Sequence, residues 1–369
     1  MKYNTTITRE LEKILVTRPY LPPLQEYELY LKEIWRTGWL TNNGILVQKL
    51  ERALGKFLGV KHVVLVANGT LALQLALQGL GIKKQVITTP FSFVATTNAI
   101  LWQGCKPVFA DINESDFCLN PQAVKRHITP STQAILPVHV YGYPCDVAAI
   151  SKIAKKHKLK VIYDGAHAFG ATLNGRSLLS FGDVSIVSLH ATKLFHTAEG
   201  GALVTNNSKL AKILASLRDF GYEGSKPVRP GINAKMSEFH AALGLCNLKA
   251  VNALINQRRK IVAFYDQALR TLPLVRPKFK RGLTYNNAYY PIVFPDSQTM
   301  QRAKAVLEKQ YIFGRRYFYP SLNTLSYCKA KRCPVSESVA SRVLCLPLYH
   351  SLEPHQVRRI ALAVISSFQ

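Results

Sequence analysis

The sequence predicts an α/β fold in which a large domain, built on a mostly parallel seven-stranded sheet flanked by helices, is followed by a smaller α+β domain. Three observations lead to this prediction. Between residues 60 and 205, short apolar runs rich in valine and isoleucine alternate with segments of helical periodicity. The runs are almost continuously apolar, which is typical of parallel strands covered on both faces. Beyond about residue 235, this alternation gives way to one long helical pattern.

The predicted elements follow in chain order. The strands are the apolar runs at residues 62–66, 85–88, 107–112, 134–140, 160–164, 184–188 and 201–205, with helices between them at 70–81, 92–104 and 146–158. A long helix over 237–272 leads to the small domain, where we expect a strand at 289–294, a helix at 297–310, an aromatic segment at 316–320 and a closing helix at 353–368. The large domain is assigned to residues 1–245 and the small domain to residues 246–369.

The composition indicates a large globular protein. With 369 residues, 48% of them hydrophobic, the chain can bury two cores. Its apolar stretches are too short to span a membrane, and residues 1–20 carry charges where a secretory leader needs an apolar core. We therefore expect a cytoplasmic protein with no membrane partner. The seven cysteines form no C-x-x-C pair and no zinc-ligand spacing, which predicts reduced thiols and no metal site.

A formal net charge of +27 is the strongest compositional signal, and such a balance is found in many nucleic-acid-binding proteins. The basic residues, however, occur in short separated groups, without a basic tail, a recognition-helix motif or an aromatic-interleaved groove. We therefore expect no nucleic-acid partner. Two interpretations remain: acidic residues are simply sparse, or a positive surface attracts an anionic substrate such as a nucleotide diphosphate.

Polar side chains follow several predicted strands, at the sheet edge where open α/β folds bind ligands. Asn68, Gly69 and Thr70 begin an apolar helix, whose free amides form either an anion site or an ordinary N-cap. Asp164 ends a buried strand and needs a partner, which could be an arginine, a helix amide or the protonated ring nitrogen of a cofactor. Lys193 follows another strand, a position where a lysine is most often a solvated surface charge.

Together, these three elements match what pyridoxal 5'-phosphate requires. The helix start would hold the phosphate, Asp164 would keep the pyridine nitrogen protonated so that the ring withdraws electrons, and Lys193 would form the Schiff base. Ser188, five residues before the lysine, could add a hydroxyl to the phosphate site. The pattern therefore predicts an enzyme that uses this cofactor.

Nine segments occur in the order typical of one enzyme family. They are GWLTNNGILVQKLERALGKFLGVKH (38–62), ANGTLAL (67–73), ITTPFSFVATTNAI (87–100), PVFADI (107–112), VHVYGYPCD (138–146), YDGAHAFGA (163–171), SLHATKLFHTAEGGALVT (188–205), GINAKMSEFHAALG (231–244) and LCLPLYHSLEPHQV (344–357). With these segments in register, the sequence resembles the DegT/DnrJ/StrS-type sugar aminotransferases over almost its whole length. The resemblance implies the type I fold of PLP-dependent (pyridoxal-phosphate-dependent) transferases and an aminotransferase activity.

The resemblance also implies roles for matching residues. Lys193 would be the Schiff-base lysine and Asp164 the partner of the pyridine nitrogen, while Gly69, Thr70 and Ser188 would hold the phosphate. Some relatives carry histidine at the lysine position and dehydrate sugars instead of aminating them. This chain keeps Lys193, which favours transamination.

Three further cofactor-binding residues are implied by the same match. Phe93 would stack on the cofactor, although alone it is as well explained as a core phenylalanine, and His167 would lie near the ring oxygen. Asn233 matches an asparagine that reaches the phosphate from the neighbouring subunit, whereas by itself it indicates only a turn. The resemblance thus implies a homodimer with shared active sites.

Two segments, FGRRYFYPSL (313–322) and HATKLFHT (190–197), resemble relatives that convert dTDP-4-keto-6-deoxyglucose to dTDP-4-amino-4,6-dideoxyglucose with L-glutamate as amino donor. That product is a precursor of an acylated sugar in bacterial surface glycans such as the lipopolysaccharide O-antigen. Arg315, Arg316 and Tyr319 would contact the nucleotide diphosphate or the sugar, or else pack the small domain. The alternatives are a 3-amino product and a non-catalytic regulatory protein of the same fold.

Overall fold

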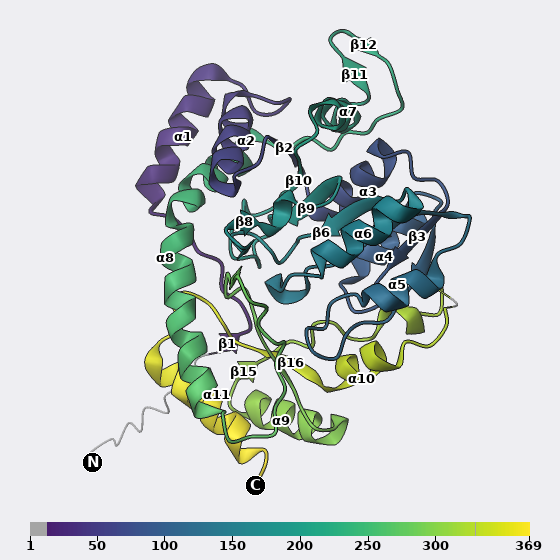
Figure 1. The fold of residues 1–369 in the computed structure, drawn as a ribbon. Coiled ribbons are helices and arrows are strands. Elements are labelled where there is room, and N and C mark those ends of the chain that lie inside the picture. The colour runs from purple at the N-terminus through teal and green to yellow at the C-terminus, as the bar shows by residue number, and fades with distance from the viewer. Residues whose placement is uncertain (1–12, 329) are drawn as a thin grey trace, which may run out of the picture.

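The computed structural model describes residues 13–328 and 330–369, and the predicted seven-stranded sheet lies at its centre (Figure 1). In spatial order the strands are β2 (His62–Val66), β10 (Gly201–Thr205), β9 (Val184–Ser188), β6 (Lys160–Asp164), β5 (Thr132–Leu136), β3 (Gln85–Thr88) and β4 (Lys106–Phe109). β10 runs antiparallel to both neighbours and the other pairs are parallel. Residues 1–12, part of the segment that argues against a secretory leader, lie outside the described residues.

Helices cover both faces of the sheet because consecutive residues of its strands are apolar. The helices of the large domain are α1 (Leu24–Thr37), α2 (Ile45–Leu58), α3 (Gly69–Gly79), α4 (Val94–Trp102), α5 (Pro121–His127), α6 (Val147–His157), α7 (Ser208–Arg218) and α8 (Glu238–Ala268). On β6, Ile162 packs in the core with α3, α4 and α7, while Val161 and Tyr163 pack in the core with α5 and α6. Helices α2 and α8 cover the other end of that second face.

The helices predicted at 70–81, 92–104 and 146–158 are confirmed, and capping residues set their ends. The side chain of Asn68 accepts the Leu71 N–H at 2.9 Å and so begins α3. Helix α8 ends at Ala268 rather than at residue 272. The helices α1, α2, α5 and α7 were not predicted from the sequence.

Two strands are shorter than predicted. The run 134–140 contributes only β5, because Pro137 has no amide hydrogen to continue the ladder, and the 3-10 turn η1 (Val140–Gly142) follows. The run 107–112 leaves the sheet after Phe109, the last residue of β4. Val138 still forms an isolated parallel bridge with Asp164 at the end of β6, so the run 134–140 turns away from the sheet only after that bridge.

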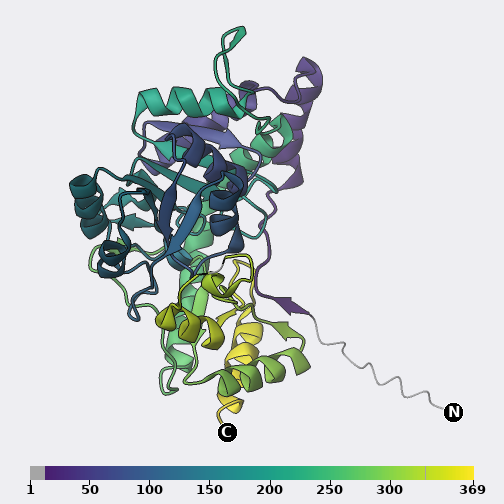
Figure 2. The same cartoon turned by 90° about the vertical axis from the view of Figure 1, so that its right-hand side faces the viewer.

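The smaller unit is α+β, as predicted, and lies below the large domain in the second view (Figure 2). It contains the antiparallel pair β14 (Tyr290–Val293) and β16 (Val343–Leu346), with α9 (Ser297–Lys309) and α11 (Pro354–Ser366). A second pair joins distant parts of the chain, because β1 (Ile14–Leu15) lies parallel to β15 (Ile312–Phe313) and Ile14 is fully buried in this core. The predicted boundary at 245/246 falls inside α8, which contributes side chains to the cores of both units.

Shorter elements complete the fold. They are the three-stranded sheet β13 (Leu283–Thr284), β7 (Thr172–Leu173) and β8 (Arg176–Ser177), the projecting hairpin β11 (Tyr222–Glu223) and β12 (Lys226–Pro227), the turns η2 (Leu178–Ser180) and η3 (Leu322–Thr324), and α10 (Pro334–Arg342). The aromatic segment 316–320 is irregular. Within residues 13–328 and 330–369, no helix has the length and apolar character needed to cross a membrane.

Candidate active site

A cavity of about 370 Å³ lies at the carboxyl edge of the sheet, where the large domain meets residues 315–318 of the small domain. Its walls come from the loops after β2, β3, β6 and β9, which meet here because parallel strands end at a common edge. The predicted site residues that line it are Gly69, Thr70, Phe93, Asp164, His167, Ser188, Lys193 and Arg315. Asn233, Arg316 and Tyr319 are not among the lining residues.

The N-terminus of α3 forms one wall of the cavity. The first amides of a helix have no acceptor within the helix, and the helix dipole adds partial positive charge there. Gly69 begins α3 directly beside Ser188, and a Cβ at residue 69 would lie 3.1 Å from the Ser188 Cβ. A side chain at residue 69 would crowd Ser188, whereas glycine leaves the backbone amides and the serine hydroxyl side by side, an arrangement that suits an anionic group.

Asp164, the last residue of β6, is buried beside the cavity. Its Oδ2 accepts the Thr96 hydroxyl hydrogen at 2.8 Å, and its Oδ1 accepts the Ala166 N–H at 3.1 Å. Burial raises the pKa of this carboxyl, while the two hydrogen bonds and the charge of Lys193 oppose the rise. The carboxylate is thus held in one orientation, where it can pair with a cationic group of a ligand.

Lys193 lies in the loop between β9 and β10 and is partly buried rather than fully solvated. Its Nζ is 3.4 Å from the Tyr289 hydroxyl. Burial lowers the pKa of the amine; Tyr317 and Asp164 oppose this shift, and the Arg315 cation adds to it. Lys193 consequently loses its proton more readily than a surface lysine, and an uncharged amine is what nucleophilic or base chemistry requires.

His167 is buried among aromatic rings on the same cavity wall. Its imidazole stacks on Phe318, with ring centroids 5.4 Å apart and planes within 10°, and it lies 4.4 Å from the Tyr289 ring. Burial, aided by the charge of Lys193, lowers the pKa of His167 well below 6.5. Its Nδ1 is buried and finds no hydrogen-bond partner within the described ranges, so a ligand atom could satisfy it.

Phe93 is not a core residue. Its side chain is 52% exposed and lines the cavity, whereas Phe91, two residues earlier, is fully buried. The interpretation of Phe93 as core packing is therefore wrong, because Phe91 takes that place. An exposed ring on a cavity wall offers a flat apolar surface to a planar ligand.

Sequence reasoning missed several lining residues. In the segment 315–319 it selected the polar side chains, but Tyr317 and Phe318 line the cavity together with Arg315, whose guanidinium stacks on Tyr317 at 4.5 Å. The segment is irregular, so no periodicity could show which side chains turn inward. Thr96 was also missed, although its contact with Asp164 positions a predicted residue.

Arg316 and Tyr319 pack on the small domain in this structure. The Arg316 guanidinium donates to the Ser341 carbonyl at 3.1 Å and stacks on the ring of Tyr319 at 3.4 Å. Their contact with substrate stays a prediction. Asn233 is exposed and away from the cavity of its own chain, and its predicted role requires a second subunit.

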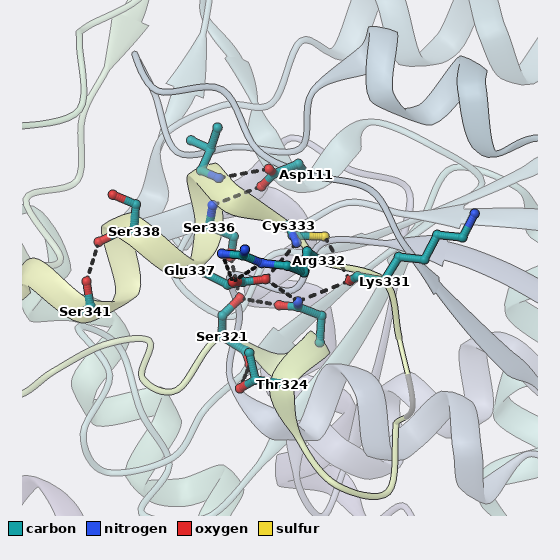
Figure 3. Close-up of polar contacts among 12 residues, drawn as sticks. Asp111, Ser321, Thr324, Lys331, Arg332, Cys333, Ser336, Glu337, Ser338 and Ser341 are labelled. Atoms are coloured by element: carbon teal, nitrogen blue, oxygen red, sulfur yellow. Dashed lines mark hydrogen bonds and ion pairs between the residues drawn. The ribbon is translucent and has the colours of Figure 1, made fainter.

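A polar network holds the small-domain wall against the large domain (Figure 3). Asp111, just beyond β4, accepts the N–H groups of Val335 and Ser336 at 3.0 and 2.9 Å, in the first turn of α10. The Ser336 hydroxyl lies 2.7 Å from the Ser321 hydroxyl, three residues beyond the lining residue Phe318. The large-domain aspartate is thereby linked to the segment that closes the cavity.

The same wall is fixed at two further points. The Tyr141 hydroxyl donates to the Tyr317 carbonyl, and the Leu322 N–H donates to the Pro90 carbonyl at 2.8 Å. Both bonds cross from the large to the small domain. The two parts of the chain that form the cavity are therefore joined by several hydrogen bonds.

Within the described ranges, no group of three or more histidine, cysteine, aspartate or glutamate side chains could hold a metal ion. The cavity instead combines an anion site at a helix start, an oriented carboxylate and a lysine of lowered pKa. These groups suit a phosphorylated, nitrogen-containing organic ligand rather than a metal.

Comparison with protein families gives a match to the DegT/DnrJ/EryC1/StrS aminotransferase family over residues 24–365. A dTDP-4-amino-4,6-dideoxy-D-glucose transaminase of Shigella dysenteriae is 43% identical over 350 residues, which cover 92% of this chain and 95% of the relative. An Escherichia coli enzyme of the same name is 41% identical, covering 94% of this chain and 96% of the relative.

Comparison with solved structures agrees with these sequence matches. The crystal structure of DesI, determined in the presence of its TDP-sugar product, superposes with a TM-score of 0.92 at 33% identity. The superposition covers 97% of this chain and 93% of DesI. The predicted fold class is therefore confirmed.

Proposed function

The chain belongs to the DegT/DnrJ/EryC1/StrS aminotransferase family, and from this premise we propose that it converts dTDP-4-keto-6-deoxyglucose to dTDP-4-amino-4,6-dideoxyglucose. In this proposal pyridoxal 5'-phosphate is the cofactor and L-glutamate is the amino donor. The observation that carries the proposal is the meeting of Lys193, Asp164 and the α3 N-terminus in one cavity.

The residues of the cavity fit this cofactor. The bare backbone at Gly69, with Thr70 and Ser188, would hold its phosphate, and Asp164 would pair with its ring nitrogen. The exposed ring of Phe93 would stack on it, and the unpaired Nδ1 of His167 would face its ring oxygen. When bound, pyridoxal phosphate supplies an electron sink that stabilises negative charge on the carbon undergoing amino transfer.

Lys193 would perform two tasks in this reaction. Its amine would hold the cofactor between reaction cycles, and it would move a proton to and from the reacting carbon. The lowered pKa supports both tasks, because each needs an amine without its proton. The Asp164 carboxylate, oriented by Thr96 and Ala166, would keep its negative charge beside the cationic ring nitrogen.

The substrate assignment rests on the two transaminases at 43% and 41% identity and on Arg315 in the cavity wall. Arg315 lines the cavity and is exposed, so its guanidinium can bind a diphosphate with paired hydrogen bonds. We place the reaction in the cytoplasm, in the supply of an amino sugar for a surface glycan.

A homodimer with shared active sites is part of the proposal. Asn233 is exposed beside the hairpin β11–β12, where it can reach a neighbouring subunit. Large apolar side chains are exposed on α1, between α1 and α2, at the start of α2, and at or beside the hairpin: Trp35, Trp39, Leu40, Ile45, Phe220 and Tyr222. Exposed apolar side chains of this size are typical of subunit interfaces.

The decisive experiment follows the absorption of the cofactor-loaded protein during two additions. L-Glutamate should remove the visible band, and dTDP-4-keto-6-deoxyglucose should restore it, after which NMR of the sugar product should show nitrogen on carbon 4. Nitrogen on carbon 3 of a matching keto sugar would replace the substrate assignment. A protein that binds the cofactor but does not respond to glutamate would support the regulatory alternative.

A further inference from the structure

The edge of the sheet opposite the cavity carries a row of lysines. Strands β2, β6, β3 and β4 all begin there, because they run parallel and end at the cavity. Six exposed lysines stand at or directly before these strand starts: Lys61, Lys83, Lys84, Lys106, Lys158 and Lys160. We call these six residues the basic edge. At a strand spacing of about 4.8 Å, the seven strands make this edge roughly 30 Å wide.

Acidic side chains do not neutralise the basic edge. Residues 52–110 contain no aspartate or glutamate. Asp183, just before β9, is the one acidic residue at this edge in the described part of the chain, and it lies 3.5 Å from Lys160. Its other oxygen accepts the Val161 N–H at 2.8 Å. The five remaining lysines therefore give this edge a strong positive potential.

Lys158 is the C-cap residue of α6, but helix capping does not explain Lys61, Lys83, Lys84 and Lys106. Lys125, Arg126, Lys155 and Lys156 lie in the last turns of α5 and α6, where they complement the helix dipole. By contrast, Lys61, Lys83, Lys84 and Lys106 lie in the connections to strands or at their first residues. Their side chains bind no described residue, so the structure of the chain alone does not require them.

An exposed tryptophan accompanies the charge. Trp102 is the last residue of α4, four residues before Lys106, and its side chain is 81% exposed. An exposed indole on a basic surface is typical of proteins that lie in the headgroup region of a bilayer, where the ring and the ammonium groups both find favourable surroundings. Neither the sheet nor a neighbouring helix covers this ring.

We propose that the basic edge and Trp102 dock the protein on an anionic lipid bilayer. A broad edge of lysines suits the diffuse charge of such a surface, and each lysine near it strengthens binding about fivefold. Nucleic-acid sites use arginine forks, grooves and several stacking aromatics, which this edge lacks. The cavity opens at the opposite edge, so docking leaves it accessible. This proposal does not depend on the reaction that the cavity catalyses.

The sequence prediction of no membrane partner considered only spanning segments and local motifs. The lysines of the basic edge belong to separate parts of the chain and come together only through the parallel topology. The proposal therefore differs from that prediction, and it requires no spanning helix, none of which is found in the described ranges.

The test measures sedimentation of the full-length protein with phosphatidylcholine vesicles, with and without phosphatidylglycerol. We expect binding only to the anionic vesicles, weakened by salt. Reversing Lys61, Lys83, Lys84 and Lys106 to glutamate should reduce the bound fraction at least tenfold, and Trp102→Ala should reduce it severalfold. The matched control reverses Arg259, Lys260, Arg270 and Lys309, which are exposed elsewhere, and should bind like wild type.

Three outcomes would overturn the proposal. Wild type could fail to bind anionic vesicles, or the control could lose binding as fully as the test variant, which would make net charge the cause. Alternatively, duplex DNA could bind in place of vesicles and be lost in the same variant, which would make nucleic acid the partner. Unchanged thermal unfolding of both variants shows that any loss is not due to misfolding.

Discussion

In the proposed reaction, Lys193 would hold the cofactor and move a proton. Its amine is partly buried, 3.4 Å from the Tyr289 hydroxyl, and its pKa is lowered by that burial. We expect Lys193→Ala to lose the visible band of bound cofactor and at least 1,000-fold in turnover, on the order of what removal of a catalytic nucleophile costs. Spectra and steady-state rates measure both effects. The control is Lys249→Ala, which replaces an exposed lysine of α8 and should keep turnover. If Lys193→Ala kept turnover as well, the assignment of Lys193 would be refuted.

His139 predicts a dependence of stability on pH. The ring is fully buried, stacks on Tyr163 at 4.6 Å, and burial lowers its pKa to about 3. Below pH 6.5 the unfolded chain binds a proton that the folded state excludes, so stability falls as pH falls. At pH 5 the loss from this one residue is about 2 kcal/mol. Buried His167, whose pKa is also lowered, acts in the same direction.

Denaturant unfolding at pH 7 and pH 5 checks this expectation. His139→Gln should be less stable at pH 7 but should lose less stability on acidification than wild type does. Replacing the exposed His157 with glutamine should leave the pH dependence unchanged. An equal loss in wild type and His139→Gln would show that other groups are responsible.

The candidate site was predictable where a residue with reactive or anion-binding chemistry lies at or near the end of a predicted strand or helix. Asp164 ends β6, Gly69 begins α3, and Lys193 lies five residues beyond the end of β9, so the ends of the apolar runs located all three. Tyr317 and Phe318 could not be found in this way, because their orientation depends on a tertiary bond from Tyr141 and not on a local pattern. The sequence could not decide whether Phe93 stacks on a ligand or packs in the core, because the exposure of its side chain depends on the tertiary fold.

At the scale of elements, α10 links the large domain to the wall of the cavity. Its first turn is capped by Asp111 of the other domain rather than by a neighbour in sequence. We expect Asp111→Ala to destabilise the protein by about 1–2 kcal/mol, as the loss of a helix cap does. Because Ser336 and Ser321 link this turn to the cavity wall, the variant should also raise the KM for the keto sugar severalfold.

A second cap provides the control. Asp296 caps α9 through the Thr299 N–H at 2.7 Å, away from the cavity. Asp296→Ala should cost similar stability in denaturant unfolding, without a change in KM. If both variants changed KM to the same extent, the hydrogen bonds of Asp111 would not be what positions the cavity wall for substrate binding.

The fold was predictable where strands are nearly all apolar, as in β2, β6 and β9. Local chemistry altered some ends, for example at Pro137 after β5. The prediction lacked α1 and α2 because their surfaces mix apolar and charged residues, and much of α1 is exposed in a single chain. The pairing of β1 with β15 could not be predicted, since strands of two residues carry no periodicity.

At the scale of the whole molecule, the proposed homodimer predicts complementation between two defective variants. Lys193→Ala and Asn233→Ala should each be impaired. If Asn233 acts on the partner's site, then mixed dimers contain one intact site, and an equal mixture should recover about a quarter of wild-type activity. Activity assays after co-refolding measure this recovery. If mass measurements show that mixed dimers form but activity does not recover, then Lys193 and Asn233 act in the active site of their own subunit.

The pairing of Ile14 with Ile312 joins residues that leave the ribosome far apart in time. About 300 residues separate the two strands, so at typical rates of synthesis the first strand waits roughly 15 to 60 seconds for the second. Until then Ile14, which is fully buried in the finished small-domain core, stays exposed to other binding partners. During this interval the strand has no pairing partner, and synthesis without residues 13–16 would leave β15 as an unpaired edge open to aggregation.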